Sequence, residues 1–198
     1  MELFDTHAHV FDKKFTRDWQ QVLERMKEAE VTQVMCVGFD VASSEKAAAM
    51  AQSRPGFWAV AGVHPHDAAK TGPNYLARLE KLAKQPKVAA LGETGLDYFR
   101  DLSPRDVQRK VFKEQLALTR ELNLPVVIHA RDAYGDLMDI LRKDGISSAG
   151  GVVHCFSGSW EIAVEAMGMG FYISIAGPVT YPKSFKLKEI ARRLKDLG

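Results

Sequence analysis

Residues 125–129 read Pro-Val-Val-Ile-His, and residues 151–155 read Gly-Val-Val-His-Cys. Both runs are short and rich in valine, and neither alternates apolar with polar residues. Continuous apolar runs of this kind are typical of strands in a parallel sheet, because helices cover both faces of such a sheet. These two segments therefore predict an α/β fold.

Similar runs recur along the whole chain, separated by segments whose apolar residues have helical spacing. This alternation predicts repeated βα units. The sequence Ser103-Pro104-Arg105-Asp106 predicts the start of the longest helix, with Ser103 as its N-cap, and that helix is expected to end near Leu122. The expected strands are Leu3–His9, Thr32–Gly38, Trp58–His64, Val88–Glu93, Pro125–His129, Gly151–Cys155 and Phe171–Gly177.

Seven βα units fit either an open doubly wound sheet or an eight-unit barrel without its last unit. A dinucleotide-binding sheet carries a glycine-rich loop after its first strand, where this sequence has histidines instead. A complete (β/α)8 barrel takes about 250 residues, and the sequence ends after the seventh unit. We therefore expect residues 1–198 to form one TIM-barrel-type domain with seven of eight units, truncated at its C-terminus.

The composition is that of a soluble globular domain. The 198 residues are 46% hydrophobic and 26% charged, which excludes disordered and collagen-like chains. A formal net charge of +2 argues against a histone-like binder of polyanions. The N-terminus does not resemble a signal peptide, no apolar run approaches the roughly 20 residues that cross a bilayer, and the two cysteines lie inside apolar runs. These features predict a cytoplasmic protein with free thiols and no membrane partner.

All six histidines fall at or just past the C-terminal end of an expected strand, the end at which barrel enzymes carry their chemistry. They are His7, His9, His64, His66, His129 and His154. Side chains alternate along a strand, so His7 and His9 point to the same side and can bind one ion together. Imidazole suits zinc, manganese, iron or nickel, so the histidines predict a metal site without naming the metal.

Glu93 ends the fourth expected strand. A carboxylate there can bridge two cations, because each of its oxygens can bind a separate ion. His7 and His9 come from the first strand, and His129 and His154 from the fifth and sixth. We therefore expect Glu93 to lie between two half-sites that share it. The alternative for these five residues is a hydrogen-bonded or ion-paired cluster without metal.

Five motifs together resemble the TatD family of metal-dependent deoxyribonucleases over essentially the whole chain. The resemblance implies a TIM-barrel hydrolase that cleaves DNA, single-stranded or at its ends, with one or two divalent ions (Zn, Mg or Mn). It implies His7, His9, Glu93, His129 and His154 as the ligands. The motifs are Phe4-Asp5-Thr6-His7-Ala8-His9, Gly62-Val63-His64-Pro65-His66, Gly92-Glu93-Thr94-Gly95-Leu96-Asp97-Tyr98, Val127-Ile128-His129-Ala130-Arg131 and His154-Cys155-Phe156-Ser157-Gly158.

The family also carries a metal-binding aspartate at the end of its eighth strand, and this sequence ends before that strand. Asp196 does not replace it, because the end of a helical segment lies on the opposite face of a barrel. Two other interpretations therefore stay open. One is a metal-binding but inactive truncated barrel, whose unpaired edges favour oligomers. The other is a hydrolase of another ester or amide, such as an aminoacyl ester of transfer RNA.

We expect His64 and Arg131 to act in catalysis with Glu93. The resemblance implies that His64 contacts the substrate phosphate, although the adjacent proline equally suits a structural turn. Arg131 shares a strand side with His129 and suits bidentate binding of a phosphate, with an ion pair to Asp132 as the alternative.

Two further residues of the third motif are candidates for substrate contacts. Tyr98 suits stacking on a base or closing a pocket wall. Asp97 suits orientation of a ligand imidazole or of Arg131. In contrast, His66 is expected at the surface.

Overall fold

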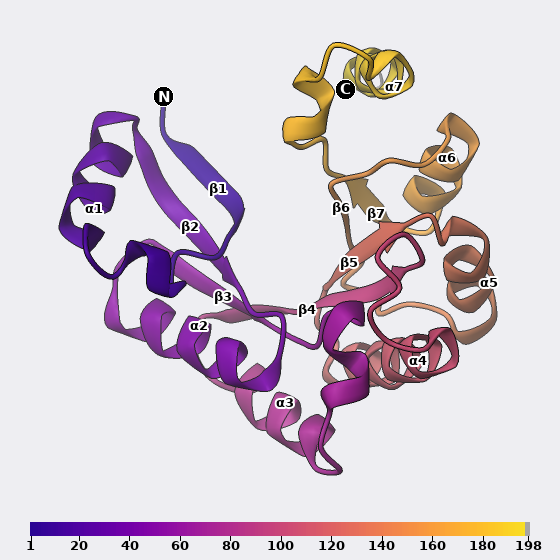
Figure 1. Cartoon of the computed structure of the whole chain (residues 1–198), viewed down its shortest axis with the longest axis horizontal. Helices are drawn as coiled ribbons and strands as arrows, with labels where there is room; N and C mark the ends of the chain where they lie inside the picture. Colours follow the sequence, from indigo (N-terminus) through magenta and orange to yellow (C-terminus); the bar gives the residue numbers. More distant parts are fainter. Residues whose placement is uncertain (197–198) are drawn as a thin grey trace.

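Seven parallel strands form one curled sheet in the computed structural model, which describes residues 1–196. Their order in the sheet is their order in the chain, so each strand pairs with the next one in sequence and β1 and β7 are the edges (Figure 1). The strands are β1 (Leu3–Ala8), β2 (Val31–Val37), β3 (Phe57–Ala61), β4 (Val88–Asp97), β5 (Val126–Arg131), β6 (Gly151–His154) and β7 (Phe171–Ile173).

One α-helix follows each strand, and helices α1 to α6 surround the outer side of the curled sheet (Figure 1). This arrangement confirms the predicted TIM-barrel-type α/β fold with seven βα units. Among residues 1–196, no helix is both long and apolar enough to cross a membrane. The elements are α1 (Trp19–Glu28), α2 (Val41–Ser53), α3 (Tyr75–Ala83), α4 (Arg105–Leu122), α5 (Tyr134–Asp144), α6 (Trp160–Gly168) and α7 (Phe185–Lys195), with short 3-10 helices η1 (Lys13–Phe15), η2 (Pro65–Lys70) and η3 (Gly177–Thr180).

All seven predicted strands are present, but three of them end three or more residues from the predicted position. β3 ends at Ala61 rather than at His64. β4 continues past Glu93 to Asp97, because its second half still pairs with β5, where Asp97 lies opposite Arg131. β7 ends at Ile173 rather than near Gly177, and the chain turns into η3, which has a proline in its first turn. The longer β4 places two carboxylates, four residues apart, on one strand.

Helix α4 ends at Leu122 as predicted but starts one residue later than predicted, at Arg105, and Ser103 is not its N-cap. The N-cap is Pro104, which has no capping side-chain bond. The hydroxyl of Ser103 instead donates to the backbone oxygen of His66 at 3.0 Å and accepts from the N–H of Ala69 at 3.1 Å. The predicted cap is wrong because a neighbouring loop uses the hydroxyl.

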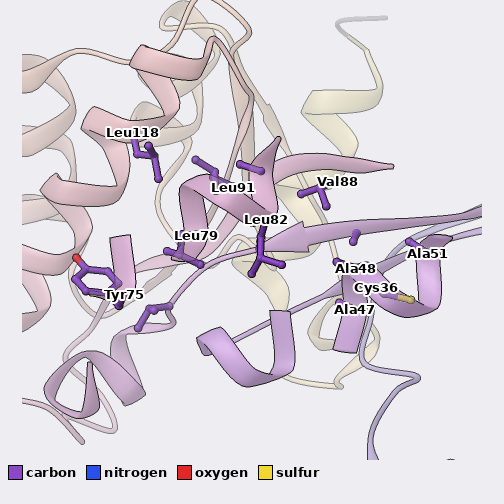
Figure 2. Close-up of a cluster of buried hydrophobic side chains, with 14 of the residues drawn as sticks. Cys36, Ala47, Ala48, Ala51, Tyr75, Leu79, Leu82, Val88, Leu91 and Leu118 are labelled. Carbon is purple, nitrogen blue, oxygen red and sulfur yellow. The ribbon is translucent and has the colours of Figure 1, made fainter. Parts of the chain in front are cut away.

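A hydrophobic cluster fills the space between the outer face of the sheet and helices α2, α3 and α4 (Figure 2). Leu79 and Leu82 of α3 pack with Leu91 of β4 in this cluster. On the concave side, a hollow of about 520 Å³ is lined largely by apolar side chains such as Val127 and Val152, with histidines at its end. The packed outer layer holds the strand ends in place around that hollow.

Candidate metal centre

The histidines and carboxylates of the predicted site converge at the C-terminal end of the sheet. Within β1, His7 lies just before the strand ends, and His154 is the last residue of β6. His129 lies opposite His154 in the pairing of β5 with β6. The ends of β1 and β6 thus meet at β4, where Glu93 lies.

Glu93 contacts imidazoles from two different strands. Its Oε2 lies 3.3 Å from Nε2 of His7, and its Oε1 lies 3.2 Å from Nδ1 of His129. Glu93 is 5% exposed. Burial favours its neutral form, but the hydrogen bonds from His129 and His7 outweigh burial and hold the pKa of Glu93 well below its ordinary value. Glu93 is therefore a buried anion with one oxygen facing each side.

His7 and His154 stack as parallel rings, with centroids 3.5 Å apart. One ligand atom from each of them and one from Glu93 lie within 4.8 Å of one another. The Nδ1 of His7 is buried without a hydrogen-bond partner among residues 1–196, although buried polar atoms are normally paired. Burial lowers the pKa of His154 to about 4, so its ring is neutral and keeps a lone pair at neutral pH. These donors fit a divalent cation.

His9 lies beside this group with its ring orientation fixed. Its Nδ1 is 2.7 Å from the carbonyl oxygen of Val37. Because a carbonyl can only accept, Nδ1 carries the proton and Nε2 keeps its lone pair in the neutral ring. The rings of His9 and His7 meet edge to face with centroids 5.2 Å apart. Hydrogen bonding of one imidazole nitrogen to a carbonyl is a common way to orient a metal-ligating histidine.

Asp97 holds a second cluster of imidazoles. Its Oδ2 lies 2.9 Å from Nε2 of both His66 and His129. Burial lowers the pKa of His129, but the hydrogen bonds to Asp97 and Glu93 outweigh burial and raise it to about 9. The same imidazoles hold the pKa of Asp97 below its ordinary value in spite of burial. His129 thus links the carboxylates of Glu93 and Asp97.

His64 completes this second cluster. Its ring centroid lies 4.3 Å from those of His66 and His129, and ligand atoms of the three rings lie within 4.8 Å of one another. Burial lowers the pKa of His64 to about 3. Its Nδ1 accepts from the N–H of His66 at 3.2 Å, so Nε2 carries the proton of the neutral ring. The expected surface position of His66 is wrong, because its ring turns inward to Asp97.

Gln115, buried on α4, holds the segment before His64. Its side-chain oxygen accepts from the N–H of Val63 at 2.8 Å. Its side-chain nitrogen donates to the carbonyl of Val63 at 3.0 Å and to the hydroxyl of Thr94 at 2.7 Å. One side chain therefore joins the residue before His64 to the residue after Glu93.

Two buried serines hold the ends of the same loop. Ser44 of α2 accepts from the N–H of Gly62 at 3.0 Å and donates to its carbonyl at 3.2 Å. Ser103 donates to the carbonyl of His66, as described above. Since β3 ends at Ala61, this loop has left the strand, and buried side chains satisfy its backbone groups instead.

Sequence reasoning missed the buried glutamines of α4. Gln108 accepts from the N–H of Asp97 at 2.9 Å and donates to its carbonyl at 3.2 Å. It lies seven residues before Gln115, on the same side of the helix. Two glutamines on the core-facing stripe of an amphipathic helix are the signal that could have identified them.

Arg131 and Tyr98 occupy the rim of the site. Arg131 is exposed, and its guanidinium lies 3.7 Å from the centre of the Phe99 ring. No ion pair joins Arg131 to Asp132 within the described part of the chain. The hydroxyl of Tyr98 donates to Oδ2 of Asp136 at 2.6 Å.

Comparison with known proteins identifies the family. The sequence matches the family model described as TatD related DNase over residues 4–197. A Bacillus subtilis protein named uncharacterized metal-dependent hydrolase YabD is 43% identical over 192 residues, covering 97% of this chain and 75% of that protein. A Pantoea vagans protein named 3'-5' ssDNA/RNA exonuclease TatD is 37% identical over 176 residues, covering 88% of this chain and 68% of that protein.

Solved structures agree with this assignment. Escherichia coli YjjV, described as a TatD homolog, matches with a TM-score of 0.88 and 30% identity, covering 95% of this chain and 73% of that chain. The names of the family and of the curated relatives indicate a metal-dependent hydrolase. With one family model matching nearly its whole length, the chain belongs to the TatD-related DNase family.

Proposed function

We propose that this chain is a divalent-metal-dependent phosphodiesterase that hydrolyses single-stranded DNA. The observation that carries the proposal is the position of Glu93, whose two oxygens face imidazoles from β1 and β5. A carboxylate in this position can bridge two ions, and paired ions suit the displacement at a phosphoryl group. The name of the Pantoea vagans relative, a 3'-5' ssDNA/RNA exonuclease, supports this substrate class.

We propose that one or two divalent ions bind among the residues expected from the sequence, with zinc, magnesium and manganese as candidates. The buried Nδ1 of His7, which has no partner in the described part of the chain, and the lone pair on the neutral ring of His154 support this assignment. When bound, such ions lower the pKa of a coordinated water and stabilise charge on the phosphoryl oxygens. The proposed ligands are His7, His9, Glu93, His129 and His154.

We assign two further roles at the site. His64 and Arg131 bind the substrate phosphate, and Asp97 orients the imidazole of His129. The neutral ring of His64 carries its N–H at Nε2, which can donate a hydrogen bond to a phosphoryl oxygen. The guanidinium of Arg131 can donate two hydrogen bonds to the same phosphate. Asp97 holds Nε2 of His129 and so directs Nδ1 of that ring towards Glu93.

The direct test mixes the protein with a single-stranded oligonucleotide and magnesium, manganese or zinc. We expect cleavage with at least one of these metals. Metal binding without cleavage under any condition would contradict the proposal and favour an inactive metal-binding barrel. Cleavage of a carboxylic ester such as p-nitrophenyl acetate, with none of DNA, would favour the ester hydrolase instead.

Substitution of Glu93 tests the shared ligand. We expect Glu93→Ala to lose metal at both half-sites together and to lose cleavage, because the bridging carboxylate is gone. A matched control is Glu165→Ala, since the Glu165 carboxylate lies on the outer helix α6 and pairs with Arg142 at 2.6 Å. Full metal content in Glu93→Ala, measured by elemental analysis, would show that Glu93 does not bridge two metal ions.

A further inference from the structure

Phe99 is an exposed aromatic residue at the rim of the site. Its side chain is 57% exposed and follows β4 in the loop that leads to α4. The guanidinium of Arg131, the last residue of β5, lies 3.7 Å from the centre of the Phe99 ring. Arg131 covers one face of the ring, and the exposed fraction leaves the rest of the ring accessible from solvent.

Asp97 connects the loop that carries Phe99 to the metal centre through hydrogen bonds. Its Oδ1 accepts from the N–H of Phe99 at 3.1 Å and from the N–H of Arg100 at 2.7 Å. Its Oδ2 is the oxygen that lies 2.9 Å from Nε2 of His129. Asp97 also lies opposite Arg131 in the pairing of β4 with β5. The backbone that carries Phe99 is therefore held by the carboxylate that orients a proposed metal ligand.

An open aromatic face beside a cation suits one class of ligand. Every nucleobase has a π-face that can stack on an aromatic ring, and one such contact contributes roughly tenfold or more to the affinity. The neighbouring guanidinium can bind a backbone phosphate. Bases in a duplex are already stacked on each other, so a single strand is the form free to use this surface.

Phe99 fits this role better than the adjacent Tyr98. The Tyr98 hydroxyl is engaged with Asp136, and the guanidinium of Arg105 lies 4.3 Å from the centre of the Tyr98 ring. Tyr98 also packs against the hydrophobic cluster behind β5. Phe99 is therefore a better candidate than Tyr98 for stacking on a base.

We propose that Phe99 and Arg131 form a platform on which one nucleobase of a single-stranded nucleic acid stacks, next to the phosphodiester bond held at the metal centre. This inference rests on the proposed function and adds to it a subsite that contacts the base. Stacking does not depend on the identity of the base. The platform would therefore select single strands over duplexes without selecting a sequence.

Binding of two oligomers to the full metal-loaded chain tests the platform. One oligomer carries thymines and the other has abasic sites with the same number of phosphates, and both have phosphorothioate linkages that resist cleavage. By fluorescence anisotropy, we expect the wild type to prefer the thymine oligomer roughly tenfold. Phe99→Ala should abolish this preference, and Phe99→Trp should retain it.

Leu102→Ala is the matched control, because Leu102 lies in the same loop and is 62% exposed but has no π-face. It should retain the preference for the thymine oligomer. Equal affinity of the wild type for both oligomers, or an undiminished preference in Phe99→Ala, would overturn the platform. Equal loss of affinity for both oligomers in Phe99→Ala would also overturn it, because such a loss would come from a change in the loop and not from lost stacking on a base.

Hydrolysis of an unmodified thymine oligomer by the wild type, measured in parallel, separates the two proposals. Cleavage together with a preference that does not depend on Phe99 would overturn the platform and leave the proposed function intact. A preference that depends on Phe99, without cleavage, would support the platform and contradict hydrolysis. If the wild type neither binds nor cleaves any oligomer, both proposals fail.

Discussion

Oδ2 of Asp97 lies 2.9 Å from Nε2 of His129, and the opposite nitrogen of that ring lies 3.2 Å from Oε1 of Glu93. One imidazole therefore spans two carboxylates that are four residues apart on β4. Because a carboxylate can only accept when ionised, this arrangement orients His129 with its Nδ1 directed at Glu93.

Asp97→Asn should weaken metal binding without removing a ligand. The amide is a poorer acceptor for His129, and loss of such a supporting carboxylate costs about 10- to 100-fold in metal affinity. Competition with a chromophoric chelator measures this affinity. The control is Asp67→Asn. The Asp67 carboxylate pairs with Lys70 at 2.6 Å, and its loss should leave the metal affinity unchanged. An unchanged affinity in Asp97→Asn would mean that Asp97 does not orient His129.

The stability of the metal-free protein should fall as the pH rises from about 6.5 to 9. The pKa of His129 is raised from 6.5 to about 9 in the folded state. The protonated ring therefore contributes its full stabilisation below pH 6.5, and this contribution is lost as the pH rises through about 9. The upper limit of this contribution is about 3 kcal/mol. Urea unfolding in the presence of a chelator, compared with His129→Gln, measures it. The same pH dependence in both proteins would contradict this assignment.

Gln115→Leu should reduce both stability and metal affinity. The substitution removes the hydrogen bonds from the Gln115 side chain to the backbone N–H and carbonyl of Val63, and a buried group left without a partner costs about 1–3 kcal/mol. It also removes the side chain that joins the segments around His64 and Glu93. Thr119→Val is the control, because Thr119 is equally buried on α4 and its hydroxyl donates to the carbonyl of Leu116 in its own helix. If both variants have wild-type metal affinity, Gln115 supports the fold but not the site.

Gly95→Ala should be strongly destabilising, by at least about 2 kcal/mol. Gly95 has φ of +143°, and an added Cβ would overlap the carbonyl oxygen of His129. Gly135→Ala is the control, since a Cβ at this helical position would meet no atom of another described segment within 4 Å. That change should leave the thermal unfolding midpoint unchanged or raised. A normal midpoint in Gly95→Ala would show that β4 and β5 can separate there.

The sequence alone was sufficient for the fold class and for the end of the sheet that carries the site. Apolar runs such as residues 125–129 end in histidine, and both the run and its end are local features of the chain. Parallel strands bring their C-terminal ends to one edge, so histidines that follow several strands must converge. The five expected ligands could therefore be proposed from local pattern and family resemblance.

The grouping of those residues was decided by the tertiary structure. Asp97 meets His66 and His129 across 31 and 32 residues of sequence, and His66 lies in a loop where strand alternation gives no direction. The stacking of His7 on His154 joins β1 to β6 only because the sheet curls. The spacing of apolar residues and the secondary-structure propensity describe one segment at a time. The contacts between these residues depend instead on the curvature of the whole sheet and on the buried glutamines that hold its loops.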